Sequence, residues 1–207
     1  MARAFSEIAF TDSVKAMQSR YGSRKAYAKF DFDKDRRDYL SEYEIAFLTE
    51  RDSFYMGSVG ENGWPYVQHR GGPKGFLKVL DQKTIGFADF MGNKQYISAG
   101  NLSTDERVSL FIMDYPNRQR LKIWARARLV YENEDAALIA QLEVTGYQAR
   151  VERGIIMTIE ALDWNCPQHI TPRYTKAEVE SLIAPLLDEI QALKAHQLER
   201  PVIASVL

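Results

Sequence analysis

Cysteine and histidine are scarce in this 207-residue chain, which has one cysteine, Cys166, and three histidines. A single thiol excludes an internal disulfide framework, and the scattered histidines leave no spacing for a zinc site, so we expect no metal centre. An excess of one charge is also lacking, because the formal net charge is -1. No apolar run is long enough to cross a bilayer, and the first residues lack the apolar core of a secretory signal. We therefore expect a cytoplasmic protein that binds neither nucleic acid nor membranes.

The composition is that of an ordinary globular protein, with 45% hydrophobic and 27% charged residues. Short alternating segments in the middle of the chain predict seven strands, at 53–59, 64–70, 75–80, 84–89, 107–114, 121–131 and 154–164. Hairpin signals such as the GENG motif connect them, which favours an antiparallel barrel or sandwich.

Helices are expected before, between and after these strands. Residues 6–22 are predicted to form one helix, and a capping box of Ser41 and Glu44 begins another. Asn133 is the expected N-cap of a helix between the last two strands. Thr175 and Glu178 form a capping box for a C-terminal helix that contains a proline, which should kink or split it. The apolar stripe of this helix predicts packing on the barrel or on a second subunit; its members are Val179, Leu182, Ile183, Leu186, Ile190 and Leu193.

The segment DFMGNKQYISAGNL, residues 89–102, resembles a strand end that turns on a glycine and continues as a helix. Gly92 permits a positive φ, and Asn93 is a good N-cap. Lys94 would then lie in the first helical turn, where the helix dipole favours an acid, and no acid occurs again until Asp105. Open backbone N–H groups beside a lysine make a site for an anion such as a phosphate. The alternative is a solvated surface lysine.

A second cationic stretch precedes it, VQHRGGPKGFLKVLD, residues 67–81. His69, Arg70, Lys74 and Lys78 surround three glycines, which suggests a bulge or a close approach to the backbone. The spacing matches neither a phosphate-binding Walker loop nor the dinucleotide fingerprint. A decorated hairpin turn is the alternative, but two cationic, glycine-rich segments on neighbouring strands favour a shared anionic ligand.

A third stretch, DWNCPQHITPRY at residues 163–174, mixes aromatic, amide, imidazole and guanidinium groups. Such a mixture is typical of a binding wall. Cys166 and His169 also permit a nucleophile and its base, as in a cysteine hydrolase, although no activating helix start or oxyanion motif accompanies them.

Together these stretches resemble the pyridoxamine 5'-phosphate oxidase-like superfamily of FMN-binding split barrels, and most of all its branch of predicted flavin-nucleotide-binding proteins. The motifs run in family order over 54–131, and DWNCPQHITPR continues them. The resemblance implies a mainly β fold with added α: an antiparallel FMN-binding split β-barrel with N-terminal helices and a C-terminal helix. It gives one domain over 1–207, with a helical extension at 1–51, the barrel at 52–164, and a loop and helical segment at 165–207.

The resemblance also implies a homodimer with two FMN sites, each built from both subunits. The residues carried over or placed near the cofactor are His69, Arg70, Lys74, Lys78, Ala88, Asp89, Phe90, Gly92, Asn93, Lys94, Arg120 and Lys122. Family oxidases have Ser-Arg-Lys where this chain has Gly92, Asn93 and Lys94, so Arg70 or Lys74 is expected to supply the second cation.

Trp164, His169 and Arg173 are the expected catalytic residues on the substrate side. The implied function is an FMN-dependent oxidoreductase that transfers hydride between a small substrate and the flavin, with NADPH or NADH as a candidate donor. The letters around Trp164 and Arg173 differ from those of the oxidases, which argues against vitamin B6 oxidation. The alternatives are a non-catalytic flavin carrier or sensor, or a barrel that binds haem or F420.

Overall fold

The computed structural model describes residues 2–32 and 35–198. Two compact units make up the chain. The first consists of Met1–Asp114 and Gln119–Gln168, and the second of Tyr115–Arg118 and His169–Leu207. Among the described residues, no helix is both long and apolar enough to span a bilayer.

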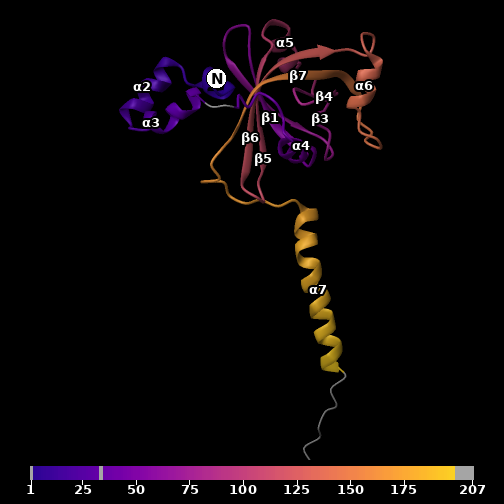
Figure 1. Ribbon diagram of the computed structural model, residues 1–207. Coiled ribbons are helices and arrows are strands. Elements are labelled where there is room, and N and C mark those ends of the chain that lie inside the picture. The colour runs from indigo at the N-terminus through magenta and orange to yellow at the C-terminus, as the bar shows by residue number, and fades with distance from the viewer. Residues whose placement is uncertain (1, 33–34, 199–207) are drawn as a thin grey trace, which may run out of the picture. The chain divides into compact units, whose positions relative to one another are not determined.

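Seven antiparallel strands in the first unit form one sheet (Figure 1). They are β1 (Ser53–Val59), β2 (Pro65–Gly71), β3 (Lys78–Val79), β4 (Thr84–Phe90), β5 (Arg107–Asp114), β6 (Gln119–Val130) and β7 (Val151–Trp164). The predicted strand at 75–80 is reduced to two residues, because a turn occupies its first half. In this turn Phe76 N donates to Pro73 O, and Gly75 has φ 76°.

The strand order is β2-β1-β5-β6-β7-β4-β3, so β2 and β3 are the two edges and the sheet is not closed by hydrogen bonds. It nevertheless curls around one core, because Phe54 on β1 contacts both Phe76 and Phe87, with ring centroids 5.7 and 5.4 Å apart. Phe87 lies on β4, near the opposite edge. The mainly β, antiparallel fold with added helices that is expected from the sequence is confirmed, and its sheet is not closed into a barrel.

The helices are α1 (Ala4–Ala9), α2 (Asp12–Arg20), α3 (Arg24–Tyr27), the 3₁₀ helix η1 (Ala28–Phe32), α4 (Glu42–Thr49), α5 (Ile97–Thr104), α6 (Ala136–Leu142) and α7 (Lys176–Leu198). The single helix predicted over 6–22 is wrong, because α1 ends at Ala9 with Phe10 as its C-cap, and Thr11 begins a new helix, α2, by accepting from Val14 N. Asn133 is not the cap of α6. Asp135 is, and its carboxylate accepts from Leu138 N at 2.9 Å.

The capping box of α4 is confirmed, and it is linked to the end of β7. Glu44 accepts from Ser41 N at 3.0 Å, and its other oxygen accepts from Trp164 Nε1 at 2.7 Å. Burial opposes the charge of Glu44, but these hydrogen bonds outweigh it and hold the pKa of Glu44 below its ordinary value. A carboxylate that is mostly buried thus joins residues 120 positions apart in the chain.

Helix α6 lies against β4 and β7 at two glycines. A Cβ on Gly154 would lie 2.7 Å from Leu142 Cδ1 of α6. One on Gly86 would lie 3.1 Å from Leu142 Cδ2 and 2.8 Å from Ile156 Cδ1 of the neighbouring strand β7. Distances of 2.7 and 2.8 Å are shorter than real Cβ contacts, so the missing side chains allow the close approach. Leu142 and Ile139 pack there in a second small core.

Helix α7 belongs to the second unit. Its capping box is confirmed, because Thr175 N donates to Glu178 Oε2 at 2.7 Å and Glu178 N donates to Thr175 Oγ1 at 3.3 Å. It is one continuous 23-residue helix that includes Pro185, so the proline does not split it. Each described side chain from residue 179 to residue 195 is exposed.

Candidate functional site

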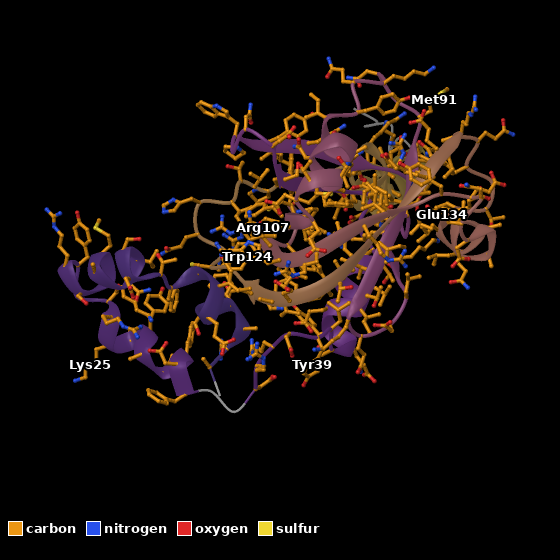
Figure 2. The ribbon with its side chains drawn as sticks, turned by 90° about the horizontal axis from the view of Figure 1, so that it is seen from above. Lys25, Tyr39, Met91, Arg107, Trp124 and Glu134 are labelled. Atoms are coloured by element: carbon orange, nitrogen blue, oxygen red, sulfur yellow. The ribbon has the colours of Figure 1, made fainter. Side chains whose placement is uncertain are left out.

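A cleft of about 220 Å³ lies where β4 ends and α5 begins. Met91, the first residue after β4, is labelled in Figure 2 and marks this end of the strand. Strand β2, the end of β4, the turn before α5, the first turn of α5 and the start of β7 contribute side chains to the cleft. Its lining is Tyr66, Gln68, Arg70, Asp89, Phe90, Gly92, Asn93, Lys94, Gln95, Tyr96, Ile97, Ser98, Ala99 and Glu152.

The turn between β4 and α5 holds two residues in the left-handed region, Lys94 at φ 61° and Tyr96 at φ 56°. Non-glycine residues adopt this conformation at a cost, and such strain gathers at functional sites. Asn93 stabilises the turn, because its side-chain oxygen accepts from Gln95 N at 3.1 Å. The predicted start of the helix at Asn93 is therefore wrong: Asn93 caps a turn, and the residue before the helix is Tyr96.

Helix α5 faces the cleft with its N-terminus. The first N–H groups of a helix have no acceptor within it, and Tyr96 supplies no side-chain cap. The first turn of α5 contains no acid that would satisfy the positive end of the dipole. The helix is held in place by Ser98 Oγ, which donates to Gln68 Oε1 at 2.9 Å, and by Asn101 Nδ2, which donates to Ser58 Oγ at 3.0 Å. An open, fixed helix end of this kind favours an anion.

A buried ion cluster forms the floor of the cleft. Arg70 Nη1 donates to Asp89 Oδ1 at 2.7 Å, and Arg153 Nε lies 3.7 Å from the other oxygen of Asp89. Arg153 Nη2 donates to Glu152 Oε2 at 2.8 Å, and Tyr96 OH donates to Glu152 Oε1 at 3.0 Å. Burial raises the pKa of Asp89 and lowers the pKa of Arg70, while their mutual attraction opposes both shifts.

The positive and negative charges of this cluster balance, and Lys94 adds one positive charge. Two arginines compensate the carboxylates of Asp89 and Glu152, so the exposed amine of Lys94 leaves the cleft with a net positive charge. The buried Nε atoms of Arg70 and Arg153 have no hydrogen-bond partner among the described residues. Buried donors without partners are costly, which indicates a polar group that completes this site.

Of the residues predicted to bind a cofactor, the structure brings six together in this cleft: Arg70, Asp89, Phe90, Gly92, Asn93 and Lys94. Two more, His69 and Ala88, line an adjoining hollow of about 170 Å³ that shares Arg70, Asp89 and Phe90 with the cleft. Residues of both cationic stretches thus line one cleft, through β2 and the turn before α5, and its role as an anion site stays a prediction.

The other predicted cations do not line the cleft of their own chain. Lys74 is exposed and lies 3.4 Å from Glu50. Lys78 is in β3, opposite Gly86. The Arg120 guanidinium lies 6.0 Å from the ring centre of Phe111.

Lys122 is covered by the N-terminal helix α1. Its amine lies 3.6 Å from an Asp163 oxygen and 4.7 Å from the ring centre of Phe5, which stacks on Trp124 at 5.2 Å. Trp124 and Arg107, labelled in Figure 2, line a second cleft of about 360 Å³ together with Ile8 of α1. The role of Lys122 and Arg120 toward a second subunit stays a prediction.

Of the predicted catalytic residues, Trp164 lies apart from the cleft lining. Trp164 ends β7, whereas Glu152 of the cleft is near the start of that strand. Its indole contacts the rings of Tyr43 and Phe47. His169 and Arg173 belong to the second unit, where the Arg173 guanidinium lies 5.1 Å from the ring centre of Tyr115.

Sequence reasoning missed Arg153, Glu152 and Tyr96. Arg153 is buried and faces Asp89 through the antiparallel register of β4 and β7, in which the two residues are directly opposite. Only that register brings them together, because they are 64 positions apart in the chain. A charged pair directly before the apolar run at residues 154–157 of β7 was the available signal.

Comparison with known proteins identifies a family. A sequence model of the pyridoxamine 5'-phosphate oxidase family matches residues 42–158, more than half of the chain. No curated protein sequence matches at a comparable level of significance.

Solved structures also match. An FMN-binding protein from Syntrophomonas wolfei is 11% identical with a TM-score of 0.43, and the match covers 72% of this chain and 97% of that one. A Clostridium acetobutylicum protein related to general stress protein 26 of B. subtilis, of the pyridoxinephosphate oxidase family, is 14% identical with a TM-score of 0.46, covering 66% and 94%. An F420 reductase is 14% identical with a TM-score of 0.45, covering 60% and 98%. From the family model over residues 42–158, we conclude that the chain belongs to the pyridoxamine 5'-phosphate oxidase family.

Proposed function

We propose that the chain binds FMN at the cleft between β4 and α5 and acts as an FMN-dependent oxidoreductase on a small substrate. The family match supports a flavin, and the cleft supports the position of its phosphate. The single observation that carries the proposal is the turn at residues 92–96, which sets Lys94 beside the uncapped N-terminus of α5.

The residues present fit a phosphate. Lys94 would supply the uncompensated charge, and the first N–H groups of α5 would donate to the phosphate oxygens. Arg70, whose charge is already paired with Asp89, would supply a further N–H donor. The unpartnered Nε atom of Arg70 gives this buried side chain a donor still to be satisfied. Because the carboxylates of Asp89 and Glu152 are already paired with arginines, the dianion would face a cleft whose remaining charge is positive.

The cleft is smaller than the roughly 300–1,000 Å³ of pockets that enclose a whole ligand, so it suits one end of FMN. We propose that a second copy of the chain completes the site in a homodimer, with Arg120 and Lys122 of that copy near the flavin ring. Bound FMN would supply the hydride chemistry, and the protein would position it. Trp164, His169 and Arg173 are proposed to contact the substrate, and NADPH or NADH is the proposed donor.

Titration of the purified protein with FMN, followed by quenching of flavin fluorescence, tests the cofactor site. We expect Lys94→Ala to weaken binding about tenfold, and Lys25→Ala, an exposed lysine of α3 labelled in Figure 2, to leave it unchanged. Equal affinities of the two variants would remove Lys94 from the site. The visible spectrum of the protein as purified, followed by mass identification of released ligand, separates FMN from F420 and haem.

A second candidate is a flavin carrier or sensor without turnover. It is favoured by one observation: the proposed substrate residue Trp164 ends β7, whereas the cleft is lined near the start of that strand, by Glu152. Anaerobic mixing of the FMN-loaded protein with NADPH, NADH or amine donors distinguishes the two. Bleaching of the flavin band supports the oxidoreductase, and an unchanged band with every donor supports the carrier.

A further inference from the structure

Helix α7 carries an apolar seam that the rest of its own unit does not cover. The exposed fractions of its large apolar side chains range from 41% for Ile183 to 60% for Leu182. An isolated helix of this length is marginal in water, and most helices are stabilised by packing of an apolar face. The seam therefore requires a covering partner.

The spacing of the seam is that of a coiled coil. Residues Val179, Ile183, Leu186, Ile190 and Leu193 follow each other at intervals of four, three, four and three. This is the heptad repeat in which two positions, a and d, face a partner helix. Both isoleucines fall at a, and both leucines of the seam fall at d. β-Branched residues at a with leucine at d favour a parallel two-stranded coiled coil.

The flanking positions of the repeat match a second copy of the same helix. Glu189 falls at position g and Lys194 at position e, five residues later. In a parallel pair, position g of one helix lies beside position e of the next heptad in the other helix. Glu189 of each copy would therefore form an ion pair with Lys194 of the other copy, and the two-fold symmetry would give two such pairs. Leu182 and Leu187 have the same g-to-e spacing and would widen the apolar contact.

Pro185 is compatible with this arrangement. It falls at position c, on the side of the helix that faces away from the seam. The helix continues through it, so the lost hydrogen bond does not interrupt the repeat. Ala192, one heptad later, falls at the same position and is likewise exposed.

We propose that α7 pairs with α7 of a second copy of this chain as a parallel two-stranded coiled coil. A helix that packed on a barrel would need only an apolar face of period 3.6, without isoleucine at a and leucine at d in each heptad from residue 183 to residue 193. An antiparallel pair would place g beside g and e beside e, which would separate Glu189 from Lys194. The charge pattern thus selects a parallel copy of the same helix.

Disulfide trapping in the full-length chain tests the pairing. In a Cys166→Ser background, Leu193→Cys places a thiol at d, where a parallel pair brings each residue beside its own counterpart. Ala192→Cys places the thiol one residue away, on the outer side. In a glutathione redox buffer we expect Leu193→Cys to form covalent dimers at least tenfold faster than Ala192→Cys, as seen on non-reducing gels.

Charge exchange provides the second measurement. Glu189→Lys or Lys194→Glu alone should slow trapping at residue 193 several-fold, and the double exchange should restore it. Equal trapping of Leu193→Cys and Ala192→Cys would overturn the proposal. So would slow trapping of both, the result expected if α7 packed on its own barrel or formed an antiparallel pair. Ile190→Cys, at position a, repeats the test if Leu193→Cys fails to fold. None of these readouts depends on FMN binding, so they stand or fall separately from the proposed function.

Discussion

Replacing Lys94 with glycine should make the protein more stable and its FMN binding weaker. The backbone of Lys94 is left-handed, with φ 61°, a conformation that costs a residue with a side chain about 1–2 kcal/mol. Glycine removes this cost but loses about 0.5–1 kcal/mol more conformational entropy on folding. We therefore expect the free energy of unfolding to rise by about 0.5–1 kcal/mol, whereas Lys94→Ala keeps the strain and should leave it unchanged.

The binding free energy should change in the opposite direction. A hydrogen bond to a charged group contributes about 1.5–3 kcal/mol, and the exposure of Lys94 favours the lower end of that range. About 1.4 kcal/mol corresponds to tenfold in Kd, so both Lys94→Gly and Lys94→Ala should bind FMN about tenfold more weakly. Because the contact is exposed, the loss should shrink as salt is added.

Urea unfolding without FMN and fluorescence titration with FMN measure the two effects separately. Lys25→Ala serves as the control for removal of an exposed lysine. A fall in stability for Lys94→Gly would show that the side chain stabilises the turn and that the left-handed backbone is not strained. An FMN affinity equal to that of Lys25→Ala would refute the reasoning that connects this turn to the phosphate.

Three further predictions concern the surroundings of the site and the core. The pKa of Glu44 in the folded protein lies below its ordinary value, so ionised Glu44 stabilises the fold when the pH is above that ordinary value. This stabilisation is lost as the pH falls through the lower pKa of the folded protein. Trp164 fluorescence should follow this acid transition, and Glu44→Gln should abolish it. Gly154→Ala should lower stability by about 1–3 kcal/mol, because its methyl group would lie 2.7 Å from Leu142 Cδ1; a melting temperature equal to wild type would show that α6 yields instead. Arg153→Met breaks a buried ion cluster and should lower stability by about 3–5 kcal/mol and weaken FMN binding, checked by urea midpoint and titration; a variant as stable as wild type would mean that the cluster is dispensable.

Local signals in the sequence predicted most strands and the capping boxes, since each depends on residues that are close together in the chain. The capping box of Ser41 and Glu44 is an example. The start of α5 was misplaced because Gly92 and Asn93 resemble a helix start, whereas the left-handed turn depends on Lys94 and Tyr96, residues for which that conformation is uncommon.

The candidate site was predictable only in part, for a related reason. Arg70 and Lys94 were identified from cationic, glycine-rich segments, and the structure places both in the cleft. Arg153 was not, because it reaches Asp89 through the pairing of β4 with β7, and strand order is a property of the whole sheet. Exposure of the seam on α7 likewise cannot be read from its pattern, which is equally apolar whether covered or open.

The position of β7 has a consequence for biosynthesis. This strand lies between β6 and β4, yet it is the last strand to leave the ribosome. Until residues 151–164 have been made, one side of β4 has no backbone partner, and the β3–β4 hairpin cannot join the rest of the sheet. A nascent chain that ends near residue 145 should therefore expose an apolar strand edge, which is the kind of surface that chaperones cover and that premature termination leaves prone to aggregation.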